Sequence, residues 1–369
     1  MDGTSVAPAA LPGMAAALPA PHAAPATNRL ALPGAQLAAA PAGHQLSGDL
    51  GHLPIPVGPV APSQRRIGAT GISVLPMALG GNVFGWTLDA QQSESVLDAF
   101  SAAGGSFLDT ADSYAGGRSE IIIGNWMRRR RNRDETVVGT KIGKSADNPG
   151  LSRRSIRAAV RASLARLQTD RIDVLYLHFD DAETSLEETL TAVDEAIRDG
   201  LVREAGFSNH AAHRVMEARI LAGLLGTRPL AALQNQYSLM ERTGYEGDLA
   251  GVARAQALAV MPRFSLASGF LTGKYRSRAD LGGHRRGGEA SKYLGKRGLR
   301  VLAALDRVAA EHGVAVGAVA IAWLLAKPLV VAPVASASTP EQLAELLAGP
   351  GVQLSRQQVA LLDRASSGA

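Results

Sequence analysis

Short apolar runs and amphipathic stretches alternate along the chain from about residue 64 onward. Within residues 90–103, for example, Val96, Leu97 and Phe100 fall at helical spacing. Similar helical patterns occupy residues 152–168, 186–199 and 211–224. The apolar runs predict eight strands, at 75–81, 106–109, 136–140, 172–178, 202–207, 230–234, 258–262 and 329–334.

Strands that alternate with helices are typical of parallel pairing, because helices must cover both faces of such a sheet. Eight units in about 300 residues predict an α/β fold of the (β/α)₈ TIM barrel class, which fits better than an open doubly wound sheet. Before the first unit, two short apolar arms flank a glycine-bounded turn at 65–74. They predict an N-terminal β-hairpin.

The first 62 residues differ from the rest of the chain. They are dominated by Ala, Pro, Gly and Leu, carry almost no charge and show no sustained period. Such a segment has no face to bury, so we expect a disordered Ala/Pro-rich extension at 1–62 and one barrel domain at 63–369. Asp2 and several prolines interrupt the pattern that a secretory signal needs, so export is not expected.

Polar side chains stand at the C-terminal ends of consecutive predicted strands. From the second strand to the sixth they are Asp109, Lys141, His178, Ser208 with Asn209, and Gln234. In a closed parallel barrel these strand ends meet at one mouth. We therefore expect the side chains to face a single cavity.

Asp109, Tyr114, Lys141 and His178 suit proton transfer. A phenol is a poor acid at neutral pH, with an ordinary pKa of about 10, but a neighbouring ammonium favours the phenolate. A buried lysine keeps its charge beside a carboxylate, which is the part predicted for Asp109. Tyr114 then donates the proton, and His178 orients a substrate oxygen. Asp112 is interpreted as a loop residue that satisfies nearby backbone groups.

Charge narrows the possible partners. A formal net charge of +5 over 369 residues suggests a mild affinity for anions, including small phosphorylated ligands, rather than a nucleic-acid surface. The basic run at 128–133 lacks interleaved aromatic residues and is interpreted as a solvated helix end. No nucleic-acid partner is therefore expected.

The sequence has no cysteine, which excludes disulfides, thiolate catalysis, iron–sulfur ligation and cysteine-built zinc sites. Carboxylates and imidazoles do not cluster at ligand spacing, so no metal is predicted. No run approaches the roughly 20 apolar residues that span a bilayer, and the longest, at 314–326, is predicted to be a buried helix. We expect no membrane partner and a cytoplasmic location.

Five motifs, at 107–114, 140–141, 175–178, 206–209 and 269–275, together resemble the aldo/keto reductase superfamily. The resemblance runs from about Arg65 to Ala365. It implies a nicotinamide-dependent reductase of aldehydes or ketones that works by hydride transfer on a (β/α)₈ barrel. It also implies a catalytic tetrad with Tyr114 as the acid, formed by Asp109, Tyr114, Lys141 and His178.

The resemblance extends to the cofactor, NADPH or NADP⁺. Ser208 and Asn209 match a pair that binds the nicotinamide carboxamide, and Gln234 matches a glutamine that helps to fix the same group. The segment 335–343 resembles one that leads into a helix binding the adenosine 2′-phosphate, which suits a helix N-terminus. The implied cofactor contacts are Gly80, Ser208, Asn209, Gln234, Phe264, Ser265, Leu266, Ser338 and Gln342.

The chain departs from the family pattern at two places near the cofactor. Many relatives carry an aromatic ring that stacks on the nicotinamide after the seventh strand, whereas here Arg263 or Phe264 occupies that place. Residues 336–345 contain no Lys or Arg, so NADH is not excluded. The basic loop 282–288 is predicted to compensate by closing over the pyrophosphate.

Two other functions stay open at this point. Barrels that resemble this family also serve as cofactor-sensing β subunits of potassium channels, which would make the chain a non-catalytic binding module. A phosphate-handling barrel isomerase would also agree with the mild positive charge. The physiological substrate, a small carbonyl compound in the leading hypothesis, and the choice between monomer and homo-oligomer are left open.

Overall fold

The computed structural model describes residues 63–283 and 285–368. Its centre is a parallel sheet in the order β10-β3-β4-β5-β6-β7-β8-β9. The strands are β3 (Ala78–Gly80), β4 (Phe107–Asp109), β5 (Val137–Ile142), β6 (Ile172–Leu177), β7 (Val202–Ser208), β8 (Ala232–Gln234), β9 (Ala259–Val260) and β10 (Val334–Ala335). Val260 of β9 also pairs with Val330, and Val334 N donates to Pro262 O, so the sheet closes on itself. The prediction of a (β/α)₈ barrel is confirmed.

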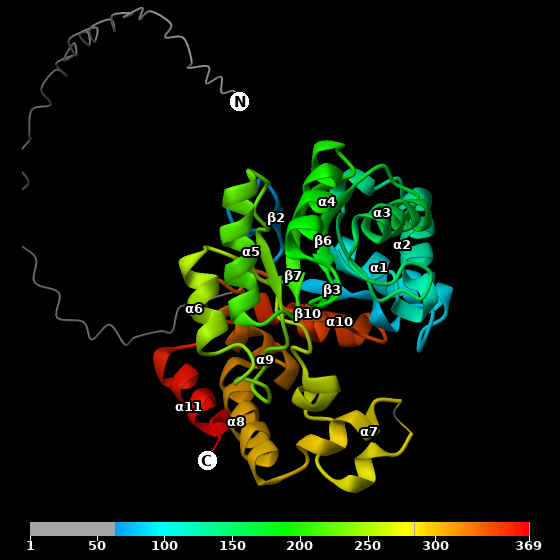
Figure 1. Cartoon of the computed structure of the whole chain (residues 1–369). Helices are drawn as coiled ribbons and strands as arrows, with labels where there is room; N and C mark the ends of the chain where they lie inside the picture. The colour runs from blue at the N-terminus through cyan, green and yellow to red at the C-terminus, as the bar shows by residue number, and fades with distance from the viewer. Residues whose placement is uncertain (1–62, 284, 369) are drawn as a thin grey trace, which may run out of the picture. The chain divides into compact units, whose positions relative to one another are not determined.

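Helices surround the strands on the outside (Figure 1). The α-helices of the described residues are α1 (Ala90–Ala102), α2 (Arg118–Arg130), α3 (Arg153–Leu167), α4 (Leu186–Arg198), α5 (Ala212–Leu225), α6 (Asp248–Ala255), α7 (Gly287–Ala290), α8 (Lys296–His312), α9 (Val316–Leu325), α10 (Pro340–Leu347) and α11 (Arg356–Ser366), of which α7 lies apart from the strands. Ser152, Ser185 and Ser355 accept hydrogen bonds from first-turn backbone N–H groups and so start α3, α4 and α11. The predicted helices at 90–103, 152–168, 186–199 and 211–224 agree with α1, α3, α4 and α5 to within one residue at each end.

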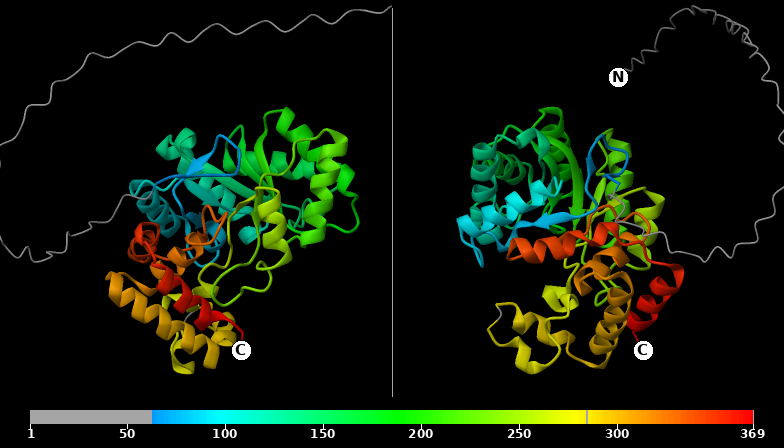
Figure 2. Two further views of the ribbon diagram at one scale, coloured as in Figure 1. Left: turned by 90° about the vertical axis from the view of Figure 1, so that its left-hand side faces the viewer. Right: turned by 180° about the vertical axis from the view of Figure 1, so that it is seen from behind.

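The predicted hairpin forms from β1 (Arg65–Arg66) and β2 (Ser73–Val74), which pair antiparallel. Ile67 and Ile72 share one buried cluster with Phe107 and Tyr176 of the barrel interior, so the hairpin covers the N-terminal ends of the strands. The hairpin and α7 lie at opposite ends of the barrel in both views of Figure 2. The mouth at the other end is thereby left for polar groups.

Side chains along each strand point alternately into the barrel and away from it, and the inward-facing side chains fill the interior. Phe107, Val174 and Tyr176 point inward below the mouth and are fully buried. A Cβ atom at Gly139 or Gly206 would lie 3.3 or 3.0 Å from the Tyr176 ring, so the two glycines make room for it. The same alternation continues upward to the polar residues at the strand ends.

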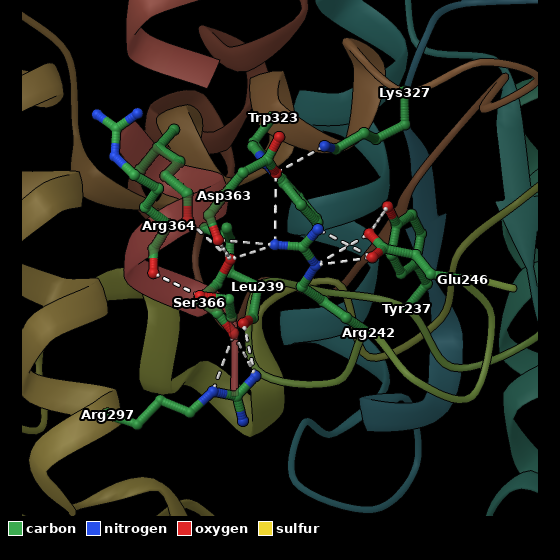
Figure 3. A network of polar contacts seen from close by, with 12 residues as sticks. Tyr237, Leu239, Arg242, Glu246, Arg297, Trp323, Lys327, Asp363, Arg364 and Ser366 are labelled. Carbon is green, nitrogen blue, oxygen red and sulfur yellow. Dashed lines mark hydrogen bonds and ion pairs between the residues drawn. The ribbon is translucent and has the colours of Figure 1, made fainter. Parts of the chain in front are cut away.

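Hydrogen bonds from arginine side chains hold the C-terminal helix α11 against the rest of the domain (Figure 3). Arg297 of α8 donates to Ser366 O at 2.8 Å, and Arg242 donates to Asp363 O at 2.9 Å. Cations suit these carbonyl groups because they lie at the negative end of the helix dipole. The Asp363 carboxylate in turn accepts from Trp323 of α9 at 2.9 Å.

The predicted extension at 1–62 lies outside the described residues. Within the described ranges, no single helix has the length and apolar character to cross a bilayer. Helices α8 and α9 pass such a test only when taken together, and a bend of 94° separates them. Every residue of α9 except Val316 is buried, in agreement with the buried helix that the sequence predicts for the apolar run at 314–326.

Candidate active site

A buried ion pair between neighbouring strands forms the centre of the site. Lys141 of β5 places Nζ 2.7 Å from Asp109 Oδ2 at the end of β4, and 2.8 Å from the Thr110 carbonyl oxygen. Lys141 is 0% exposed and Asp109 is 2% exposed. Burial acts to lower the pKa of Lys141, but the charges and hydrogen bonds of Asp109 and Tyr114 raise it above its ordinary value. The lysine therefore stays charged although it is buried.

Gln234 holds the second oxygen of Asp109 from across the barrel. At the end of β8, it donates from Nε2 to Asp109 Oδ1 at 2.7 Å. Gln234 Oε1 and the buried Tyr176 hydroxyl oxygen have no hydrogen-bond partner of normal geometry within the described part of the chain. Both oxygens of the carboxylate are thus fixed by donors, which sets the position of the lysine.

Tyr114 reaches the ion pair from the loop after β4. The chain turns there through Ala115, Gly116 and Gly117, whose φ angles of 51°, 65° and 84° are left-handed. This turn places the ring beside Lys141, with Nζ 4.9 Å from the ring centroid. Ala115 thus adopts a backbone conformation that glycine takes more easily.

His178 follows β6 and faces Tyr114 edge to face, with ring centroids 6.2 Å apart. It is 9% exposed. Burial and the charges of Lys141, Lys144 and Arg263 lower the pKa of His178 to about 3. The imidazole is therefore neutral at physiological pH, and it can hydrogen-bond a substrate oxygen without delivering a proton of its own.

Ser208 and Asn209 lie at the end of β7, as predicted, but their polar atoms already have partners. Asn209 Nδ2 donates to His178 O at 2.7 Å and to Ser208 Oγ at 3.1 Å. Asn209 Oδ1 accepts from Arg263 Nε at 2.9 Å and from Nη2 at 2.5 Å. A carboxamide ligand would have to share Asn209 with this arginine.

Arg263 and Phe264, in the segment after β9, point in different directions relative to the site. Arg263 turns toward the site, where its charge acts on His178 and is itself influenced by Tyr114 and Asp109. Phe264 turns outward, is 41% exposed, and lies under the Arg263 guanidinium at 4.9 Å. Ser265 is buried and donates to Pro262 O at 3.0 Å, and Leu266 begins a tight turn. The residue of this segment that faces the tetrad is therefore Arg263.

The remaining predicted cofactor residues lie where β3 and α10 begin or end. Gly80 ends β3, opposite Asp109, and its carbonyl oxygen accepts from Ser336 Oγ at 2.8 Å. Ser338 N donates to Gln342 Oε1 at 3.0 Å, so these two residues form part of the N-terminal cap of α10. Within the described residues, Ser338 and Gln342 make no hydrogen bond to the residues around Lys141.

Two further cations line the edge of the mouth. Burial lowers the pKa of Arg286 and of Lys274, and neither forms an ion pair within residues 63–283 and 285–368. Arg286 lies 5.7 Å from the Trp86 ring, and Arg285 donates to Trp86 O at 3.4 Å. The basic loop thus touches the loop that follows β3, which is a suitable place for a phosphate-bearing ligand.

Sequence reasoning missed a buried network beside Tyr114. Glu120 accepts from Thr140 Oγ1 at 2.5 Å and from Arg166 Nε at 2.7 Å, and so joins α2, β5 and α3. Asp112 accepts from Gly143 N at 3.2 Å, in agreement with its predicted loop role. Burial and the Glu120 charge raise the pKa of Asp112 to about 6. The sequence does contain one indication of this network, because Glu120 falls on the apolar face of α2.

The basic run at 128–133 is engaged by acidic side chains. Arg129 pairs with Glu94 and Arg130 with Asp98, both on α1. Arg133 donates to the Thr136 and Arg171 carbonyl oxygens and pairs with Asp173. The run forms the end of α2 and the turn after it, as expected.

Two clefts of about 580 and 690 Å³ lie on other parts of the surface. The first is next to the end of α11, and the second lies along α3. Neither contains a predicted site residue. The candidate site is therefore defined by side-chain geometry at the mouth and not by the size of a cleft.

A parallel barrel whose strand ends gather an Asp–Lys pair, a tyrosine and a neutral histidine falls among the barrel oxidoreductases. The sequence profile of the aldo/keto reductase family matches residues 76–367. The chain belongs to the aldo/keto reductase family. Proteins of this family generally use nicotinamide cofactors and act on small carbonyl compounds, and membership supports an oxidoreductase activity.

Three relatives illustrate the range of the family. A Saccharomyces cerevisiae protein provisionally named as an aryl-alcohol dehydrogenase is 32% identical over 84% of this chain and 88% of its own length. A norsolorinic acid reductase of Aspergillus flavus is 31% identical over 80% of this chain and 79% of its own. A protein of Oryza sativa subsp. japonica provisionally named as a voltage-gated potassium channel β subunit is 34% identical over 76% of this chain and 89% of its own.

Proposed function

We propose that this protein reduces aldehydes or ketones with NADPH and that Tyr114 is the proton donor. The observation that supports the proposal is the arrangement of Tyr114 between the charged Lys141 and the neutral His178. Loss of the phenolic proton leaves a phenolate that the adjacent ammonium stabilises. Two relatives named as a dehydrogenase of aryl alcohols and a reductase of norsolorinic acid agree with this chemistry.

The residues at the mouth suit a nicotinamide dinucleotide. The exposed Lys274 and the half-buried Arg286 are cations that can bind its phosphates, and the amide of Gln234 and the hydroxyl of Ser208 can meet its carboxamide. When bound, the reduced nicotinamide supplies the hydride. The chain then has three tasks: His178 orients the carbonyl oxygen, Tyr114 protonates it, and the Asp109–Lys141 pair holds the charge that favours this transfer.

The replacement Tyr114→Phe tests the acid. We expect kcat for an aromatic aldehyde to fall by about 10²- to 10⁴-fold, the range for loss of a general acid, while the Kd for NADPH stays nearly unchanged. Tyr245→Phe, which alters a phenol packed on Tyr237, is the matched control and should keep full activity. Reductase activity retained by Tyr114→Phe would show that another group is the acid.

The preference for NADPH over NADH is part of the proposal. The N-terminus of α10, capped by Thr339, offers backbone N–H groups to a phosphate, while Arg285 and Arg286 add basic charge beside Trp86. Fluorescence titration with both nucleotides tests this preference directly. Equal affinities would remove NADPH selectivity and leave the reductase proposal standing.

The channel-subunit relative supports a second candidate, a cofactor-sensing module that binds a membrane partner. The two candidates differ in one measurement. A module binds NADPH but oxidises it negligibly with any member of a panel of aldehydes, ketones and sugars, whereas a reductase turns over at least one. The complete set of Asp109, Tyr114, Lys141 and His178 favours the reductase.

A further inference from the structure

Helix α5 packs between α4 and α6 on the outside of the barrel (Figure 1). Its inward side is buried, for example at Val215 and Ala218. Its outward side is apolar as well: Ile220 is 58% exposed, Leu224 is 78% exposed and Leu225 is 44% exposed. Leu224 is the most exposed large hydrophobic side chain of the described residues. The part of the chain that the structure describes therefore leaves an apolar surface of α5 open to water.

Single exposed apolar residues are ordinary on a protein surface, whereas a group of neighbouring ones marks a contact surface. Helix α3, in the same outer layer, shows the ordinary case, since its exposed residues include Arg157 and no large apolar side chain. On α5, Ile220 and Leu224 are one turn apart, and Leu221 and Leu225 fall on the same side of the helix. We name these four residues the apolar face of α5.

The order of residues along the apolar face of α5 is self-complementary. When two identical helices pack antiparallel about a two-fold axis, residues at equal distances on either side of the axis lie opposite each other. With the axis at the Ala222–Gly223 peptide bond, Ile220 lies opposite Leu225 of the second copy. In the same way, Leu221 lies opposite Leu224 of the second copy. Every large apolar side chain of the face then meets another one.

Opposite charges stand at the two ends of the apolar face, and the same axis pairs Glu217 with Arg228 of the second copy. Glu217 is exposed and accepts from Arg214 Nη1 at 2.6 Å through Oε2, and no other hydrogen bond of the described residues reaches its carboxylate. The Arg228 side chain is 52% exposed and lies 3.6 Å from Glu204 Oε1, which is longer than a hydrogen bond. Each can therefore form a further ion pair at the rim of the contact, where such a pair fixes the register of two surfaces more than their affinity.

We propose that two copies of this chain associate through the apolar faces of α5, packed antiparallel, to form a homodimer. The apolar side chains supply the affinity, and the two Glu217–Arg228 pairs set the direction of the helices. The apolar face lies in the C-terminal half of α5, whereas α5 begins just after the mouth residues at the end of β7. Both mouths therefore stay open, and the dimer does not depend on the proposed reductase activity. A contact of one helix is small for a stable dimer, so we expect a Kd on the order of 10 µM.

Sedimentation velocity of the full chain between about 1 and 200 µM, a range that brackets this Kd, measures the association. The wild type should change from monomer to dimer over this range. Leu224→Glu places a carboxylate in each half of the apolar contact and should raise the Kd by about 100-fold or more. Leu299→Glu changes a leucine of α8 that is 46% exposed and is the matched control, whose Kd should stay within about twofold of wild type. Circular dichroism checks that each variant is folded.

Exchange of the end charges tests the antiparallel direction. Glu217→Arg and Arg228→Glu each bring like charges together at both ends of the contact and should each raise the Kd by about fivefold or more. The double variant restores opposite charges and should return the Kd to within about twofold of wild type. Single reversals without effect, or a double variant that associates no better than either single variant, would refute this direction of packing.

A wild type that stays monomeric over the whole range would refute the dimer and leave the apolar face to a different protein. The contact through α5 is equally refuted if Leu224→Glu leaves the dimer intact, or if Leu299→Glu dissociates it to the same extent. NADPH oxidation is measured separately in the wild type and in Leu224→Glu. If both associate as expected but neither reduces a carbonyl compound, the proposed function fails and the dimer stands.

Discussion

The Asp109–Lys141 pair gives the most direct prediction. Asp109→Asn keeps the size of the side chain and an oxygen for Gln234 Nε2, but it removes the only negative charge within ion-pair distance of Lys141 in the described residues. The ammonium is 0% exposed and cannot turn to water. Removing one partner of a buried pair typically costs about 3–5 kcal/mol, so we expect the free energy of unfolding at pH 7 to fall by about that amount.

The pH dependence of this loss identifies its cause. In the wild type the pKa of Lys141 is raised above 10.5, so its stabilisation is complete below pH 10.5 and disappears only as the pH rises through the folded-state value. In Asp109→Asn, burial dominates and lowers the folded-state pKa below 10.5. The unfolded chain then binds the extra proton, so stability of the variant should rise with pH, by up to about 1.4 kcal/mol per unit, until about pH 10.

Equilibrium urea unfolding at pH 7 and pH 9.5 measures both effects. The double variant Asp109→Asn with Lys141→Met removes the stranded charge and should recover about half or more of the lost stability, since the two sites are directly coupled. The proposed roles also require both variants to lose reductase activity. If the free energy of unfolding of Asp109→Asn falls by less than about 1 kcal/mol, or if it depends on pH as it does in the wild type, the conclusion that water does not reach this ion pair is refuted.

Two further replacements test the surroundings of the site. The pKa of Asp112 is raised to about 6, so the stabilisation by its protonated form is present at pH 4 and is lost as the pH rises through 6. Relative to wild type, the stability of Asp112→Asn should therefore increase by up to about 3 kcal/mol between pH 4 and 7.5. A difference in urea unfolding that stays constant over this range would contradict the raised pKa. In Gly124→Ala, the new Cβ would lie 2.5 Å from Arg166 O, so we expect thermal unfolding to show that the free energy of unfolding falls by about 1–3 kcal/mol. Gly223→Ala on α5, where the new Cβ would meet open space, is the control and should raise the free energy of unfolding by about 0.5–1 kcal/mol.

The barrel was predictable because its signals are periodic and local. Strands such as β4 and β6 read as short apolar runs, and α1 and α3 as amphipathic stretches, so eight alternating units point to one fold. Side chains along each strand alternate between the interior and the exterior of the barrel, so an inward-facing residue at the C-terminal end of a strand must face the mouth. The positions of Asp109 and Lys141 therefore follow from the fold, although the 2.7 Å contact between them does not.

Other parts of the site depend on contacts between distant segments. Arg263 reaches Asn209 from the segment after β9, where its backbone N donates to Asn235 O, and the chain then turns through positive φ angles at Phe264 and Ala267. No local pattern announces this turn, since neither residue is a glycine or an asparagine. The Glu120–Arg166 bond likewise joins residues of two packed helices, and which charged side chain pairs with which is settled only by that packing.

The barrel interior explains why a few charges at the mouth can control the chemistry. Below Lys141, the interior is filled by apolar side chains and by Tyr176, whose ring takes the space left by Gly139 and Gly206. The hairpin covers the far end, so the packed interior offers solvent no route to the ion pair from beneath. The Lys141 charge is therefore poorly screened, and its effect on Tyr114 and His178 is larger than the same charge would have on the surface. Electrostatic control at the mouth thus depends on an apolar floor that itself takes no part in the reaction.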